Sequence, residues 1–225
     1  KWSEPQLASI SGQYDDSDPH LTNDGKTLYF ISQRPSPGVD QISPDIWKTE
    51  KDKSDNWDTP VRLSNSVNSP ETEYSPRTDR EGNLYFASTR PGGFGQGDLY
   101  MALKDGNQFD VLINLGNTVN SDKGEWNLEV SQNGKVLIFE ASEREENLSP
   151  YGDLYISFKR KNEWSVPQHL KELNTTGSDL TPYLADKGRT LYYASSDSLK
   201  SPDVNIYFIE FEALCRKYKK SLNSQ

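Results

Sequence analysis

Short hydrophobic runs recur along this chain at a nearly constant interval. Each begins with a leucine and continues with two aromatic or aliphatic residues: Leu28-Tyr29-Phe30, Leu84-Tyr85-Phe86, Leu137-Ile138-Phe139 and Leu191-Tyr192-Tyr193. A second run, polar and then apolar, follows each of them: Asp45-Ile46-Trp47, Asp98-Leu99-Tyr100, Asp153-Leu154-Tyr155 and Asn205-Ile206-Tyr207. A period of about 54 residues predicts four copies of one supersecondary unit.

Each copy carries the signals of four short strands. A turn with glycine precedes the leucine run in every copy, at Gly25, Gly82, Gly134 and Gly188, and such turns supply the positive φ of a tight hairpin. The strand before that turn is expected near residues 18–22 in the first copy. A Trp-x-x-Pro segment ends the unit at residues 57–63 and 164–170, where proline suits an edge strand. The pattern predicts an all-β, four-bladed β-propeller with four-stranded antiparallel blades.

The two ends of the chain bear on ring closure. The chain begins with a further copy of the last strand of the unit, Trp2-Ser3-Glu4-Pro5-Gln6-Leu7, whereas the fourth unit ends without one. We therefore expect the N-terminal strand to complete the last blade and close a propeller formed by residues 1–211. The alternative is an open part of a larger propeller.

Residues 212–225 are expected to form a C-terminal tail. Phe211, Leu214, Cys215 and Tyr218 have helical spacing, with basic residues between them. This spacing predicts a short helix packed on the ring. A basic docking tail is the alternative.

Composition and charge exclude several classes of protein. Aromatic residues make up 11% of the chain, which argues against disorder. The net charge of −9 disfavours a nucleic-acid partner, because phosphate binding needs a basic surface. The single cysteine, Cys215, cannot form an internal disulfide, and no apolar run approaches the roughly 20 residues that span a bilayer.

The second copy carries the motif most completely, as Leu84-Tyr85-Phe86-Ala87-Ser88-Thr89-Arg90, a Gly-rich turn and Asp98-Leu99-Tyr100. These units resemble the WD40-like (PD40) repeats of TolB-type β-propellers. The resemblance covers nearly the whole chain and implies a bacterial periplasmic, cell-surface or secreted protein that binds or scaffolds others. The chain begins at Lys1 without Met, so an export signal is expected to lie outside this sequence.

One row of acidic residues is expected near the start of the innermost strands. Asp18, Glu73, Glu125 and Asp179 are assigned to equivalent positions, and two residues further on lie His20, Ser75, Asn127 and Thr181. If the innermost strands line the axis, these eight side chains form an axial binding site. Four carboxylates there would suit a hard cation such as Ca²⁺, and no other cofactor is expected. The alternative is that each carboxylate caps backbone amides or pairs with an arginine.

Other polar residues recur in a way that indicates structure. Asp45, Asp98 and Asp153 begin the third strand of their units, and Arg34, Arg90 and Arg144 follow the second strand, with Asp197 in the place of the arginine in the fourth copy. A catalytic residue is needed once, whereas a residue that ties a blade together is needed in every blade. We therefore expect Ser/Arg/Asp networks that stabilise the blades.

Four aromatic residues are candidates for contact with a ligand. They are predicted at loop tips or beside the innermost strand: Phe94, Tyr151, Tyr14 and Trp126. Tyrosine and tryptophan at such places often contact proteins or sugar rings, although packing beneath the loop is the alternative. Residues 35–44 form the longest turn between second and third strands, where functional insertions often occur.

The sequence favours a non-enzymatic, extracytoplasmic binding or scaffold module whose partner is a protein, a peptide or a cell-envelope glycan. The alternative is a carbohydrate-active enzyme, a glycoside hydrolase or lyase, that uses axial carboxylates. Such an enzyme needs two carboxyl groups in unequal environments, whereas the repeated row is nearly symmetric. The oligomeric state stays open.

Overall fold

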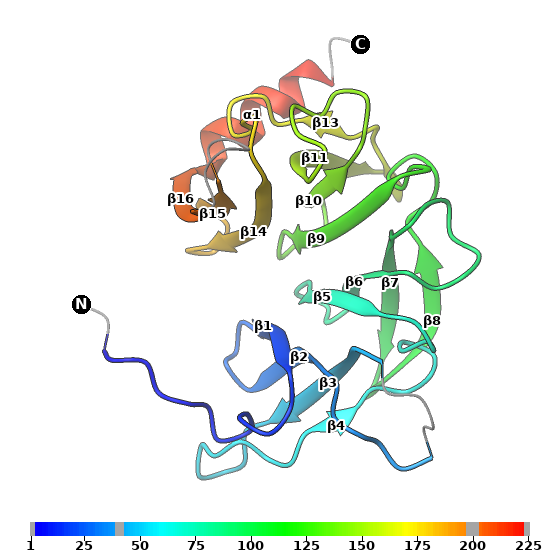
Figure 1. The fold of residues 1–225 in the computed structure, drawn as a ribbon, viewed down its shortest axis with the longest axis vertical. Helices are drawn as coiled ribbons and strands as arrows, with labels where there is room; N and C mark the ends of the chain where they lie inside the picture. The colour runs from blue at the N-terminus through cyan, green and yellow to red at the C-terminus, as the bar shows by residue number, and fades with distance from the viewer. Residues whose placement is uncertain (1–2, 39–42, 197–202, 223–225) are drawn as a thin grey trace.

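The computed structural model describes residues 3–38, 43–196 and 203–222, and it is a four-bladed β-propeller. Four antiparallel sheets are arranged in an arc around their first strands (Figure 1). No helix among the described residues is both long enough and apolar enough to cross a membrane.

The first two sheets have the four strands expected of each copy. Sheet 1 contains β1 (Asp16–Leu21), β2 (Thr27–Ser32), β3 (Asp45–Glu50) and β4 (Val61–Arg62) in that order. Sheet 2 contains β5 (Glu73–Thr78), β6 (Leu84–Ser88), β7 (Asp98–Asp105) and β8 (Gln108–Asn114). The predicted hairpins and leucine-run strands are confirmed in both.

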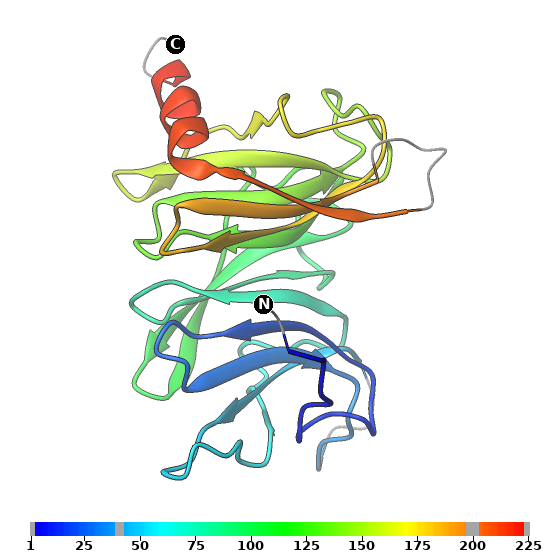
Figure 2. The ribbon, with the colours of Figure 1, turned by 90° about the vertical axis from the view of Figure 1, so that its left-hand side faces the viewer.

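The last two sheets do not have four strands: sheet 3 has five, and sheet 4 has three among the described residues. Sheet 3 contains β9 (Gly124–Val130), β10 (Val136–Ser142) and β11 (Asp153–Arg160), and its outer strand is split into β12 (Glu163–Trp164) and β13 (Gln168–His169), which both pair with β11. Sheet 4 contains only β14 (Asp179–Ala185), β15 (Thr190–Ser195) and β16 (Asn205–Glu210) among the described residues. The chain ends in α1 (Phe211–Ser221), the short helix expected in the tail, which directly follows β16 (Figure 2).

The prediction that an N-terminal strand completes the last blade is wrong for the described residues. Residues 3–15 form no strand, and Trp2 lies outside the described residues. The segment is instead held on sheet 1, where the guanidinium of Arg34 donates to the Ile10 carbonyl at 3.2 Å and Ser11 donates to Asp16 at 2.8 Å. The outer face of β16 stays exposed, with Ile206 78% and Phe208 69% accessible.

The hydrophobic core lies between the sheets. Three clusters of buried side chains join sheets 1 and 2, sheets 2 and 3, and sheets 3 and 4, and α1 contributes Phe211, Leu214 and Tyr218 to the last of them. The apolar runs of blades 2 and 3 are therefore buried on both faces, because each of these blades lies between two neighbours, whereas the run at Asn205-Ile206-Tyr207 in blade 4 is exposed on one face.

Repeated polar networks hold blades 1, 2 and 3 together, as the sequence predicts. Arg90 stacks over Phe86 and Tyr100, with its guanidinium carbon 5.3 and 4.9 Å from the two ring centroids, and Arg34 and Arg144 stack in the same way in their own blades. Asp45 pairs with Arg62 at 2.5 Å and Asp153 with His169 at 2.6 Å, so these aspartates join the third strand to the outer one. Asp197 and residues 39–42 of the long turn lie outside the described residues.

A buried asparagine clamps the third strand of three blades. The Leu99 amide donates to Asn120 Oδ1 at 2.8 Å, and Asn120 Nδ2 donates back to the Leu99 carbonyl at 3.1 Å. Asn68 makes the same pair of bonds to Ile46, and Asn174 to Leu154. Each clamp gives the buried amide of its strand residue an acceptor and adds a second donor to the carbonyl, which also accepts from the backbone of Leu63, Leu115 or Leu170.

Replacing Asn120 by alanine tests this clamp. The substitution removes the Asn120 oxygen that accepts from the buried Leu99 amide, while the Leu99 carbonyl keeps its bond from the Leu115 amide at 3.0 Å. We therefore expect the free energy of unfolding to fall by about 1–3 kcal/mol. Denaturant unfolding measures the loss. Asn117→Ala, at an exposed position of the same loop, is the control, and equal midpoints for the two variants would contradict the assigned role.

Candidate functional site

The acidic row of the innermost strands begins at Asp16, which corrects the predicted assignment of Asp18. Asp16 pairs with Ser32 as Glu73 pairs with Ser88 and Asp179 with Ser195. The sequence holds a signal for this register, because Asp16, Glu73, Glu125 and Asp179 each stand nine residues before the glycine of their hairpin turn. Asp18 belongs to the next row, two residues further along.

These carboxylates belong to the blade networks and form no axial ring. Glu73 is fully buried and accepts from Ser69 at 2.6 Å, Ser88 at 2.9 Å and Arg90 at 3.0 Å. Glu125 is bound in the same way by Ser121 and Arg144. Burial raises the pKa of Glu73, and the hydrogen bonds from Ser69 and Ser88 oppose that rise. Within the described ranges no three His, Cys, Asp or Glu side chains gather at metal-binding distance, so the predicted Ca²⁺ ring is not formed there.

The second row connects three blades through hydrogen bonds. Asp18 accepts from the Ser75 amide at 3.1 Å, and Ser75 Oγ donates to Asn127 Oδ1 at 2.5 Å. A β-bulge interrupts each innermost strand here, and Asp18, Ser75 and Thr181 have φ between 47° and 50°. The predicted residues Asp18, Ser75 and Asn127 are therefore brought together, and Thr181 is the exposed counterpart in blade 4.

His20 lies in a third row and not beside Ser75 and Asn127 as predicted. Its Nε2 is 2.8 Å from the Thr78 hydroxyl and accepts from the Thr78 amide at 3.0 Å. Burial lowers the pKa of His20 to about 3, and the nearby charge of Arg77 acts in the same direction. His20 is therefore neutral at physiological pH and joins blades 1 and 2, while Arg77 joins blade 2 to Glu129 of blade 3 at 3.1 Å.

The sequence interpretation missed Glu140, the most unusual residue near the axis. Glu140 pairs with Leu154 on β11 as Ala87 pairs with Leu99 on β7, so it occupies a position that is Ile31, Ala87 and Ala194 in the other copies. It is 6% exposed, and its Oε2 accepts from Asn127 at 2.7 Å. Burial raises its pKa to about 7, against the hydrogen bond from Asn127 that favours ionisation. An alignment of the four copies could have found Glu140, because the equivalent residue is apolar in the other three copies.

Glu140 and Asn127 form a shallow pocket with two aromatic residues. Tyr74, Trp126, Asn127 and Glu140 line a volume of about 350 Å³, which we name the aromatic pocket. The rings of Tyr74 and Trp126 meet edge to face at 5.6 Å, and the indole N–H donates to Ser142 at 3.1 Å. The pocket thus combines flat aromatic surfaces from two blades with a carboxyl group and a carboxamide.

The Gly-rich turn of blade 2 supports the indole of Trp126. Gly97 and Gly124 form a parallel bridge, and the Glu125 amide donates to the Gly97 carbonyl at 2.9 Å. A Cβ atom on Gly97 would lie 2.3 Å from the indole, and one on Gly124 would lie 2.6 Å from it. Glycine is therefore required at both positions, because Trp126 packs directly against the backbone.

The other predicted loop-tip aromatics do not join this pocket. Phe94 and Tyr151 are 49% and 65% exposed and do not line it. Tyr14 lies under Arg34 at 5.4 Å and lines a separate hollow of about 460 Å³ on blade 1, together with Trp47 and Trp57. Of the four candidates, only Trp126 lines the pocket that contains Asn127 and Glu140.

No family model and no curated protein matches the chain. Solved structures match it through the fold. A structure described as a glycoside hydrolase aligns over 90% of this chain and 72% of its own, with a TM-score of 0.58 and 10% identity. A puromycin-hydrolyzing peptidase of Mycobacterium tuberculosis has a TM-score of 0.54 and 13% identity over 92% of this chain, which spans only 31% of the peptidase. A structure described as puromycin hydrolase has a TM-score of 0.51 and 12% identity, over 88% of this chain and 27% of its own. At these identities the likeness shows the propeller fold alone.

The raised pKa of Glu140 gives the folded protein a pH-dependent stability. The folded state holds the proton up to a pKa of about 7, whereas the unfolded carboxyl loses it near its ordinary value of 4.5. The stabilisation that comes from this protonated carboxyl is complete below pH 4.5 and is lost as the pH rises to about 7. Glu140→Gln mimics the protonated acid, so above pH 7 we expect it to be more stable than the unaltered protein by on the order of 1–3 kcal/mol.

Chemical denaturation at a series of pH values measures this difference. The advantage of Glu140→Gln should shrink toward low pH, and the contribution of Glu129 cancels because both proteins contain it. Glu145→Gln, at an exposed position on the same blade, is the matched control. A pH-independent difference would show that folding does not shift the pKa of Glu140, because the folded and unfolded states would then bind equal numbers of protons.

Proposed function

We propose that this protein is a non-enzymatic binding module that holds a glycan in the aromatic pocket. The observation that carries the proposal is the pocket itself, in which Tyr74, Trp126, Asn127 and Glu140 meet where the copies of the repeat differ. Residues that only build blades recur in each copy. Glu140, by contrast, introduces a carboxyl group at a position that is apolar elsewhere.

The chemistry of the pocket suits a sugar ring. Trp126 and Tyr74 supply large, rigid aromatic surfaces with a polar handle, which suit the apolar C–H face of a sugar. Asn127 accepts one hydrogen bond from Ser75 and donates one to Glu140, so one N–H and one lone pair of its amide remain for a ligand. With a pKa of about 7, Glu140 is present in both protonation states near neutral pH, and its protonated form both donates and accepts. A pair of vicinal hydroxyls satisfies these groups.

The repeat type supports an extracytoplasmic setting as part of the same proposal. Ser88 and Arg90 of the TolB-like motif bind Glu73, and Arg144 binds Glu125 as Arg90 binds Glu73, so these motif residues have structural roles. We assign the chain to the TolB-like propellers and to the periplasm or cell surface of a bacterium on that resemblance. A protein or peptide partner is the competing ligand class.

A second candidate function is cleavage of a glycan, and Glu140 is the observation that favours it. A carboxyl group with a pKa of about 7 beside a tryptophan is a suitable proton donor at neutral pH. Glycoside hydrolysis also needs a second carboxylate, and Asp18 is connected to Glu140 through Ser75 and Asn127. New reducing ends that disappear in Glu140→Gln would establish cleavage, whereas retained binding without reducing ends supports the binding module.

Replacing Trp126 by alanine tests the proposed glycan site. Loss of the aromatic surface should weaken binding to a panel of envelope glycans at least about tenfold. Binding is measured on an immobilised glycan array and confirmed by titration calorimetry. Phe208→Ala, which removes a 69% exposed aromatic ring from blade 4, is the matched control and should bind normally.

Two results would contradict the proposal. Unchanged binding by Trp126→Ala would place the glycan elsewhere on the molecule. The absence of binding to every glycan of the panel by the unaltered protein would instead favour a protein or peptide partner, which a pull-down from envelope extracts would then identify.

A further inference from the structure

A groove with a basic wall lies between blades 2 and 3, away from the aromatic pocket. It consists of two hollows of about 740 and 760 Å³ that share Met101, Leu103, Lys159 and Asn162 as lining residues. One side is formed by the turn before β6 together with β7 and β8. The other side is formed by the turn before β10, the β11–β12 hairpin and α1. We name it the inter-blade groove.

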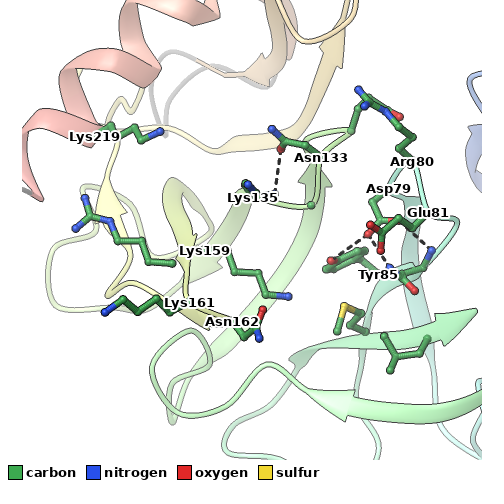
Figure 3. Close-up of a pocket in the computed structure, with 16 residues that line it drawn as sticks. Asp79, Arg80, Glu81, Tyr85, Asn133, Lys135, Lys159, Lys161, Asn162 and Lys219 are labelled. Atoms are coloured by element: carbon green, nitrogen blue, oxygen red, sulfur yellow. Dashed lines mark hydrogen bonds between the residues drawn. The ribbon is translucent and has the colours of Figure 1, made fainter.

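The charge of this groove is opposite to that of the protein as a whole. The chain carries a net charge of −9. The groove nevertheless has more cationic than acidic side chains: Arg80, Lys135, Lys159, Arg160, Lys161 and Lys219 against Asp79, Glu81 and Glu163. Figure 3 shows Lys135, Lys159, Lys161 and Lys219 on one side of the first hollow, with Asp79 and Glu81 on the other.

Three of these cations are not neutralised within the protein. Across the described ranges, Lys135, Lys161 and Lys219 form no ion pair. Asp79 is buried, and its carboxylate accepts two bonds from Asn83, at 3.0 and 2.9 Å, and one from Tyr85. The acid nearest the floor is therefore engaged locally, and the basic wall faces the groove with its charge available to an anion.

The floor and the remaining polar groups indicate what kind of anion fits. Trp164 lies partly buried in the second hollow, with Lys159 Nζ 5.6 Å from its ring centroid. The first hollow is also lined by three carboxamide side chains: Gln132, Asn133 and Asn162. A carboxamide both donates and accepts hydrogen bonds, so it can bind neighbouring hydroxyl groups of a ligand. The cations are spread along the first hollow, and Lys159 among them also lines the second. Such a spread suits charges repeated along a chain better than a single compact ion.

We propose that the inter-blade groove binds an acidic glycan, a chain that carries carboxylate groups on its sugar rings. The cationic wall pairs with the carboxylates, the carboxamides bind hydroxyls, and Trp164 contacts a ring face. This site is separate from the aromatic pocket, so the protein would hold an acidic polysaccharide at two places. The proposal extends the proposed function but does not depend on the aromatic pocket.

Affinity electrophoresis in gels that contain polygalacturonate tests the proposal, with neutral dextran and polyglutamate gels in parallel. The unaltered protein should be retarded by polygalacturonate and not by dextran, and the retardation should fall as salt rises to ~0.5 M. Lys135→Glu/Lys161→Glu should weaken the interaction at least about tenfold, because two attractions become repulsions. Lys26→Glu/Lys53→Glu, with the same charge change at exposed positions of blade 1, should bind as the unaltered protein does.

The outcomes separate this site from the aromatic pocket. Loss of polygalacturonate binding in the Lys135/Lys161 variant, with binding retained in Trp126→Ala, supports the groove even if the aromatic pocket binds nothing. Equal loss in both lysine variants would show an effect of net charge and overturn the proposal. Retardation by polyglutamate as strong as that by polygalacturonate would overturn the glycan assignment in favour of an acidic peptide, and no retardation by polygalacturonate would overturn the site.

Discussion

The buried carboxylate at the start of each innermost strand is the contact on which the rest of the blade depends. Glu73 accepts hydrogen bonds from the loop that precedes it, from the second strand and from Arg90, which itself stacks on the aromatic core of the blade. A buried charge must be paired and hydrogen-bonded, and Glu125 accordingly has a preceding-loop serine, Ser121, and an arginine, Arg144, as partners. Once the strand is held in this way, the residue two positions later faces the neighbouring blade near the axis, where Ser75 and Asn127 meet.

Much of the fold could be predicted from the sequence, because a repeat shows each structural requirement several times. The period predicts the blades, and the arginines and aspartates have the structural roles that their recurrence indicates. The predicted register of the first blade is wrong because Asp18 is matched to Glu73, whereas Asp16 is the residue that stands nine positions before its glycine as Glu73 does. The N-terminal strand is predicted because residues 2–7 resemble the last strand of the repeat unit. Such a similarity does not show which sheet edge the segment can reach.

The candidate site could be predicted only in part. Trp126 and Asn127 stood out as candidates, but their meeting with Tyr74 and Glu140 depends on how two blades face each other. The pKa of Glu140 arises from burial, which a single position in a sequence does not reveal. The Gly-rich turn gained a definite role, since Gly97 lets Trp126 lie on the backbone. The candidate site thus lies where copies of the repeat differ, and the residues that the copies share build the blades.

A crystal structure of the protein with the tightest-binding oligosaccharide of the glycan panel would show whether the aromatic pocket holds a sugar. We expect a sugar ring against the indole of Trp126, with hydroxyl groups within hydrogen-bond distance of Asn127 and Glu140. An oligosaccharide seen at full occupancy elsewhere on the protein, with the aromatic pocket filled only by water, would contradict the account.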